Sequence, residues 1–308
     1  MLKPRALTRG DRIAVVAPAS PFRREDFARG ADELERLGFR PVFDERVFDR
    51  RGYLAGEATA RAEAIAAAWR DEGIAAVMMA RGGYGSVQVL PYLPVEQARR
   101  ARKAFIGYSD LTSILSFLTI QCGVVCFHGP SVAGCLGRGE AGYDADSLVR
   151  AVTCAEPLGA VRARGLEALT AGEARGVLLG GTLTQLVASL GTPFAFDPPV
   201  GHVLLIDEVN ERPYRLDRML TQLALAGILG RASAIVFGEL PACDEPSGPT
   251  ARATVADVLR DFRGPVLFGL PTGHTAGPAI TVPLGVRARV VAEPEPALII
   301  EEAAVEQG

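Results

Sequence analysis

The sequence predicts an α/β fold made of two domains. Three observations lead to this prediction: short apolar runs alternate with helical patterns, the chain has 308 residues, and its last part changes to short β-type segments. Alternating strands and helices are typical of a parallel sheet covered by helices. A chain of this length is enough for two domains of about 150 residues each.

Residues 1–165 are predicted to form a Rossmann- or flavodoxin-like parallel sheet domain. Strands are expected at Arg12–Ala17, Arg40–Phe43, Ile74–Ala80, Ala104–Gly107 and Val124–Phe127, and helices at Asp26–Leu37, Thr59–Arg70 and Leu111–Ile120. In such sheets the ligand crevice lies beyond the carboxyl ends of the strands. We therefore expect a site where loop 18–21, loop 81–86 and the turn at Ser109 meet.

Residues 176–308 are predicted to form a mixed α/β domain with a β-rich end, after a linker at 166–175 that is rich in small and charged residues. Strands are expected at His202–Ile206, Ala234–Phe237 and Val266–Phe268, and helices at about Tyr214–Leu225 and Ala251–Phe262. The tail from Ala279 to Ile300 alternates in short segments, as β structure does.

Composition narrows the range of binding partners and cellular compartments that we expect for this chain. The net charge of −3 gives no general attraction for nucleic acid or an anionic membrane. No apolar stretch approaches the roughly 20 residues that a membrane helix needs, and the early run from Ile13 to Ala19 is interpreted as a strand, not a signal peptide. Five cysteines without Cys-x-x-Cys spacing indicate a reducing cytoplasm. The three histidines lack metal-site spacing, so we expect neither a metal ion nor a cofactor.

Ser109 follows the apolar run Ala104–Gly107 and precedes a helical pattern, which would place its hydroxyl at a sharp strand-to-helix turn. Backbone N–H groups at a helix N-terminus can stabilise negative charge on a substrate oxygen. Ser109 is therefore a candidate nucleophile. The alternative is that Ser109 or Asp110 only caps the helix.

The segment from Arg81 to Ser86 contains three glycines after an apolar strand, so its backbone can approach a bound anion closely. A dinucleotide site fits poorly, because Gln88 stands where Gly or Ala is needed. An oxyanion hole opposite Ser109 is the better functional interpretation, and a tight turn without a ligand is the alternative.

Two further segments offer an acid and a base. Asp207 and Glu208 follow the strand His202–Ile206, and His274 lies in a loop bounded by Pro and Gly. The chain order serine, acid, histidine is that of an α/β-hydrolase triad, which favours His274 over His128 and His202. Each segment also has a plain structural interpretation, as a solvated loop or a structural histidine.

Taken together, these segments resemble the LD-carboxypeptidase family of serine peptidases, which act on murein peptides. The similarity runs nearly end to end, through ordered motifs at 10–20, 81–85, 107–110, 180–184, 211–220 and 273–274. It implies an N-terminal α/β domain with the nucleophile and a C-terminal domain with the acid and the histidine.

By position, the resemblance assigns the nucleophile to Ser109, the general base to His274 and the oxyanion hole to the backbone N–H groups of Gly83 and Asp110. The family has Glu-Asp-Val where this chain has Asp207-Glu208-Val209, so an ungapped alignment gives the acid as Asp207, with Glu208 as the alternative. Neighbouring strand side chains face opposite ways, so Glu208 could take the place of Asp207 only if the end of the strand shifts.

The resemblance also implies a substrate: a cytosolic murein tetrapeptide whose L,D bond is cleaved to release D-alanine during peptidoglycan recycling. Arg81 is a candidate for the terminal carboxylate and Tyr84 for the substrate chain, and a homodimer is expected. One alternative is a microcin C immunity-like hydrolase of peptidyl or aminoacyl nucleotides, which shares the scaffold. The other is a non-catalytic ligand-binding protein that lost chemistry through the exchange at 207–208.

Overall fold

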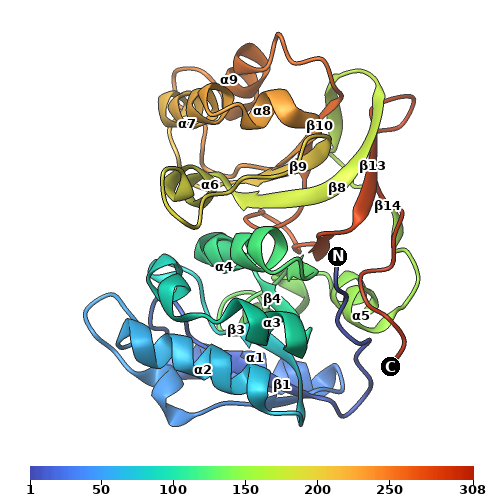
Figure 1. Cartoon of the computed structure of the whole chain (residues 1–308). Helices are drawn as coiled ribbons and strands as arrows, with labels where there is room; N and C mark the ends of the chain where they lie inside the picture. Colours follow the sequence, from blue (N-terminus) through green and yellow to red (C-terminus); the bar gives the residue numbers. More distant parts are fainter.

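The computed structural model describes residues 1–308 and contains two sheets with helices packed against them (Figure 1). In Figure 1 the N-terminal half, drawn from blue to green, forms the lower body, and the yellow and orange segments form the upper one. The predicted α/β fold is confirmed. No helix of the structure is long and apolar enough to cross a bilayer.

The lower sheet has six strands in the order β12-β5-β4-β3-β1-β2. Their bounds are β1 (Arg12–Val16), β2 (Arg40–Val42), β3 (Ile74–Met79), β4 (Ala104–Gly107), β5 (Cys126–His128) and β12 (Val282–Leu284). The first five strands run parallel, in the order 2-1-3-4-5 that is typical of flavodoxin-like domains. The sixth, β12, comes from the C-terminal part of the chain and pairs antiparallel with β5.

Helices cover this sheet. They are α1 (Arg24–Arg36), α2 (Ala58–Arg70), α3 (Val95–Ala101), α4 (Thr112–Ser116) and α5 (Ala145–Thr153), with short 3-10 or π turns at Glu45–Phe48, Ser86–Tyr92, Ser109–Leu111, Phe117–Gln121 and Leu136–Ala141. In Figure 1, α4 lies between the lower and the upper body, so the turn that begins this helix faces the boundary between them.

The upper sheet has eight strands in the order β6-β14-β13-β8-β9-β10-β11-β7. Their bounds are β6 (Gly159–Val161), β7 (Glu167–Thr170), β8 (Glu173–Thr182), β9 (His202–Asp207), β10 (Ala232–Gly238), β11 (Val266–Leu270), β13 (Arg287–Val291) and β14 (Ala297–Ile300). The helices are α6 (Leu183–Ser189), α7 (Pro213–Leu225), α8 (Ile228–Arg231) and α9 (Ala251–Val258). The β-rich tail is present as β12, β13 and β14.

Residues 166–175 do not form the expected linker. They contain β7 and the start of β8, and the earlier strand β6 already belongs to the upper sheet. Because β7 is an edge strand whose residues are only half-buried, it lacks the continuous apolar run that marks a central strand. The chain instead crosses between α5 and β6, and β12 crosses back to the lower sheet.

Candidate active site

Ser109 stands at the sharp turn that the sequence predicts. It follows β4 after one residue, Tyr108, and is the first residue of the 3-10 turn Ser109–Leu111 that leads into α4. Its φ is +61°, a left-handed conformation that a residue with a side chain seldom adopts. Strain of this kind persists where the surrounding structure imposes it, often at functional sites. The turn therefore has the backbone of a nucleophile elbow, although Leu111 stands where the usual motif has a second glycine.

The structure brings Ser109, His274 and Asp207 into one chain of contacts. Nε2 of His274 lies 3.1 Å from Oγ of Ser109, and Nδ1 lies 2.7 Å from Oδ2 of Asp207. The other carboxylate oxygen of Asp207 accepts the backbone N–H of His274 at 2.9 Å. Thr182, which ends β8, donates its hydroxyl to Oδ2 at 3.2 Å. Asp207 is fully buried, so these donors compensate its charge in place of water.

These contacts fix the tautomer of His274. A carboxylate can only accept, so Nδ1 carries the hydrogen and Nε2 offers its lone pair to the Ser109 hydroxyl. Burial alone would lower the pKa of His274, but the hydrogen bond and the charge of Asp207 outweigh burial, and the pKa lies above its ordinary value. His274 is therefore arranged to take up a proton from Ser109.

Glu208, the alternative acid, points away from His274. Its carboxylate accepts from the backbone N–H and the hydroxyl of Thr184 at 2.9 and 2.7 Å, and from the backbone N–H of Val209 at 2.9 Å. Burial raises the pKa of Glu208, against the effect of these donors. Glu208 thus holds the start of α6 against the end of β9, as expected for the neighbour of an inward-facing strand residue.

The Gly-rich loop runs beside Ser109. A side-chain carbon built on Gly82 would lie 3.2 Å from Oγ of Ser109 and 3.7 Å from the backbone nitrogen of Asp110. The next residue, Gly83, has a φ of +103°. Neither the Gly83 N–H nor the Asp110 N–H donates to any group of the protein, so both are free to bind a substrate oxygen. This is what an oxyanion hole requires.

The two residues expected to bind substrate, Arg81 and Tyr84, belong to this loop, and neither forms a hydrogen bond with Ser109. Arg81 is exposed and donates to the carbonyl oxygen of Pro21 at 3.2 Å. Tyr84 is 46% exposed, and its ring centroid lies 5.8 Å from that of Tyr53, another exposed aromatic residue. Both side chains can be reached from solvent, and their roles in binding remain predictions.

Sequence reasoning missed a second histidine that lies beside Asp207. His128, at the end of β5, is fully buried, and its Nε2 lies 3.8 Å from Oδ2 of Asp207 without a hydrogen-bond partner. Its Nδ1 lies 3.3 Å from the hydroxyl of Thr272, which donates to the carbonyl oxygen of Ile280. Nδ1 therefore carries the hydrogen. Burial lowers the pKa of His128 to about 4, against the effect of Asp207, so the ring is neutral at pH 7.

The side chain of Asp110 has a structural role in addition to its free N–H. It accepts the backbone N–H of Ser86 at 2.8 Å and the side-chain amide of Gln185 on α6 at 3.1 Å. Burial raises the pKa of Asp110, and the hydrogen bonds from Ser86 oppose this rise. Asp110 thus joins the nucleophile turn to the Gly-rich loop and to the upper body. No sequence pattern marks Ser86 or Gln185 for this role.

The loop that carries His274 is held by both sheets. It begins after β11 of the upper sheet and ends at β12, where Val282 pairs with His128 of the lower sheet. Within the loop, Gly273 has a φ of +66°, and a side-chain carbon there would lie 2.5 Å from both Oδ2 of Asp207 and Cε1 of His128. Only glycine fits, so the loop packs tightly against both partners.

No group of three or more His, Cys, Asp or Glu side chains is close enough to hold a metal ion. An α/β fold with a serine in a strained turn, a histidine in contact with it and a buried carboxylate behind the histidine is typical of a hydrolase that works by acyl transfer.

Two family models match the chain, the LD-carboxypeptidase N-terminal domain over residues 13–129 and the LD-carboxypeptidase C-terminal domain over residues 175–290. The chain belongs to the LD-carboxypeptidase family, and it is therefore a hydrolase of the peptidase type.

Named relatives cover nearly the whole chain. A protein of Bacillus subtilis with the name "Probable murein peptide carboxypeptidase" is 33% identical over 316 residues, which cover 99% of this chain and 96% of the relative. The crystal structure of muramoyltetrapeptide carboxypeptidase from Oxalobacter formigenes is 27% identical, has a TM-score of 0.81 and covers 94% of this chain and 97% of its own. The structure of MccF in complex with glutamyl sulfamoyl guanosine is 21% identical, with a TM-score of 0.90 and coverage of 98% and 99%. At that identity the last similarity shows the fold alone.

Proposed function

We propose that this protein is a serine-type LD-carboxypeptidase that releases the C-terminal D-alanine from murein tetrapeptides in the cytoplasm. The observation that carries the proposal is the contact of Nε2 of His274 with Oγ of Ser109 at 3.1 Å, with Asp207 behind the histidine. The names of the Bacillus and Oxalobacter relatives support a murein peptide as substrate. Five free cysteines suit the reducing cytoplasm, where peptides from peptidoglycan turnover are recycled.

In the proposed reaction, His274 takes the proton of Ser109 as the serine oxygen attacks the carbonyl carbon of the scissile amide. The N–H groups of Gly83 and Asp110 bind the resulting oxyanion. The imidazolium, stabilised by Asp207, then protonates the leaving nitrogen of D-alanine. Water, deprotonated by His274, releases the peptide from Ser109 and restores the free enzyme.

The test is D-alanine release from a murein tetrapeptide by the wild-type protein and by Ser109→Ala. We expect the substitution to abolish release while thermal unfolding stays unchanged, because the hydroxyl is lost without a change in packing. A matched peptide that ends in L-alanine is the substrate control, and it should not be cleaved. D-alanine release by Ser109→Ala would contradict the mechanism.

The MccF-like alternative is tested in the same experiment. Its fold similarity extends over 98% of this chain. Aminoacyl and peptidyl nucleotide analogues form a second set of substrates. They are incubated with the wild-type protein and with Ser109→Ala, and release of the amino acid is measured. Cleavage of these compounds but not of the tetrapeptide would assign the site to nucleotide conjugates.

A further inference from the structure

Arg61 is a buried cation without a carboxylate partner. Arg61 lies in the first turns of α2 and is only 4% exposed. No Asp or Glu side chain forms an ion pair with it. Instead it donates to the carbonyl oxygens of Gly85 at 2.8 Å, Gly56 at 3.1 Å and Pro18, and to the side-chain oxygen of Gln88 at 2.7 Å. A buried charge is costly unless it is well compensated. Here three of the four acceptors are backbone carbonyl oxygens of loops.

One of these loops, the Gly-rich loop, lies against Ser109 through Gly82, and the loop that contains Pro18 is bonded to it. A single nitrogen of Arg61, Nη1, bonds both the carbonyl of Pro18, just after β1, and the carbonyl of Gly85, in the Gly-rich loop after β3. The guanidinium therefore ties together the loops that leave two neighbouring strands. Gly83, whose free N–H is a proposed oxyanion donor, lies two residues before the tied carbonyl of Gly85.

The two loops are also bonded to each other on either side of Gly83. The backbone N–H of Ser20 donates to the carbonyl of Gly82 at 3.2 Å, and the backbone N–H of Tyr84 donates to the hydroxyl of Ser20 at 3.1 Å. A side-chain carbon on Gly83 would lie 2.4 Å from that hydroxyl oxygen. The direction of the Gly83 N–H thus depends on how loop 18–20 is held, and Arg61 holds it.

The fit around the guanidinium is close. A side-chain carbon on Gly85 would lie 3.0 Å from Nη1 of Arg61 and 2.6 Å from Cδ2 of Leu54. The planar fork of arginine can donate in several fixed directions at once, whereas the ammonium group of lysine is a compact point charge. Lysine at position 61 would keep the charge but could not reach all four acceptors in this geometry.

We infer that Arg61 is a positioning residue of the oxyanion hole: by bonding Pro18 and Gly85 it fixes the backbone N–H of Gly83 toward the oxygen that becomes negative in the transition state. The inference rests on the proposed function of Ser109 as nucleophile. Arg61 itself does not touch the substrate.

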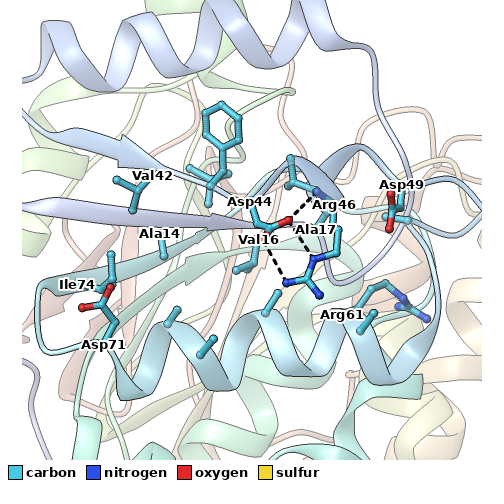
Figure 2. A pocket seen from close by; sticks show the side chains of 18 of the residues that line it. Ala14, Val16, Ala17, Val42, Asp44, Arg46, Asp49, Arg61, Asp71 and Ile74 are labelled. Carbon is cyan, nitrogen blue, oxygen red and sulfur yellow. Dashed lines mark hydrogen bonds and ion pairs between the residues drawn. The ribbon is translucent and has the colours of Figure 1, made fainter.

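A cavity next to Arg61 makes the inference testable by chemical rescue. Figure 2 shows this cavity between α2 and β1, with Arg61 at one end of it. Its volume is about 410 Å³ and its walls are mainly apolar, and its lining includes residues exposed at the surface, among them Phe43, Asp44 and Asp49. A small guanidinium ion can therefore enter from solvent and reach the space that Arg61→Ala would leave.

The experiment compares wild-type protein with Arg61→Lys, Arg61→Ala and a control, Lys103→Met. Lys103 is a partly buried cation at the other end of α2, where its Nζ donates to the carbonyl oxygens of Ala68 and Asp71, far along the helix from the Gly-rich loop. Its loss should lower stability without changing turnover. For each protein, kcat and KM for the tetrapeptide are measured, with the affinity for a peptidyl phosphonate that mimics the tetrahedral oxyanion.

We expect both Arg61 variants to lose about 100-fold in kcat, comparable to the loss of one oxyanion donor, with KM changed less than about threefold. Phosphonate affinity should fall by the same factor as kcat/KM. Ethylguanidinium should restore part of the activity of Arg61→Ala and none of that of Lys103→Met. If Arg61→Ala does not fold, Arg61→Lys carries the test alone.

Unchanged kcat in the Arg61 variants, or unchanged phosphonate affinity despite lower kcat, would overturn the inference and leave Arg61 a purely structural residue. If the wild-type protein releases no D-alanine, the proposed function fails instead. In that case the rate at which a fluorophosphonate labels Ser109, which also depends on the oxyanion donors, is compared between the wild-type protein and the variants. Equal labelling rates would overturn the Arg61 inference independently.

Discussion

Replacing Asp207 with Asn distinguishes the role of Asp207, the last residue of β9, from that of Glu208, the residue after it. The backbone N–H of His274 donates to Oδ1 of Asp207, so the amide oxygen of an asparagine must take that position. The amide NH₂ then faces Nδ1 of His274, where Oδ2 now accepts a hydrogen bond at 2.7 Å. The imidazole has to turn its lone pair toward this NH₂, which leaves the hydrogen on Nε2. In that tautomer His274 cannot accept the proton of Ser109.

We expect Asp207→Asn to lower kcat about 10⁴-fold, the loss typical of a wrong histidine tautomer, which corresponds to about 5 kcal/mol of transition-state stabilisation. The assay is D-alanine release, with thermal unfolding as the check on folding. Glu208→Gln is the matched control, because Glu208 bonds Thr184 and Val209 instead of the histidine. Its kcat should change less than about tenfold, with the loss appearing in stability. Equal losses of kcat in both variants, or a tenth of the activity left in Asp207→Asn, would refute this reasoning.

Three further predictions concern the surroundings of the histidine. Asp207 raises the pKa of His274, and His274 must be neutral to act as the base. We therefore expect kcat/KM to fall as the pH drops through a midpoint above 6.5. A midpoint at or below 6.5 in a pH–rate profile contradicts this. His128 has a pKa of about 4 in the folded protein against an ordinary 6.5, so it should cost about 3 kcal/mol of stability as the pH falls from 6.5 to 4. Urea unfolding of His128→Asn should show a pH dependence smaller by that amount, and an unchanged dependence argues against it. Gly273→Ala should destabilise the protein by about 2–4 kcal/mol, because alanine is strained in the left-handed conformation and its side-chain carbon overpacks the site. It should also greatly reduce kcat. A variant with the Tm and kcat of the wild-type protein would show that the loop relaxes.

The fold could be predicted largely because the central strands are apolar on both faces. β3 and β9 are almost completely buried, so each appears in the sequence as an uninterrupted apolar run. The strand β7 gave no such signal, since it lies at the edge of the upper sheet. The short β12 could be expected as β structure, but its place in the lower sheet depends on a pairing across about 150 residues of sequence that no local pattern encodes.

The candidate site likewise contains some residues that the sequence predicts and others that it does not. Ser109 and His274 come after the ends of buried strands and Asp207 ends one, a position with a known meaning in α/β proteins. The groups around them do not have such a position. Arg61 lies on a helix with an ordinary pattern, and His128 ends a strand like many buried residues. The roles of Arg61 and His128 depend on which backbone carbonyl or carboxylate each side chain contacts in the folded protein. A single sequence does not contain that information.

The strand β12 determines when, during synthesis of the chain, the histidine and the serine can come together. Until residues 282–284 leave the ribosome, β5 has no neighbour on one side, and the histidine loop is anchored at only one end. A nascent chain can form the other five strands of the lower sheet, with the serine in its turn, yet it has no base held against that serine. If the proposed mechanism holds, the contact between Ser109 and His274 that it needs is therefore formed only near the end of synthesis.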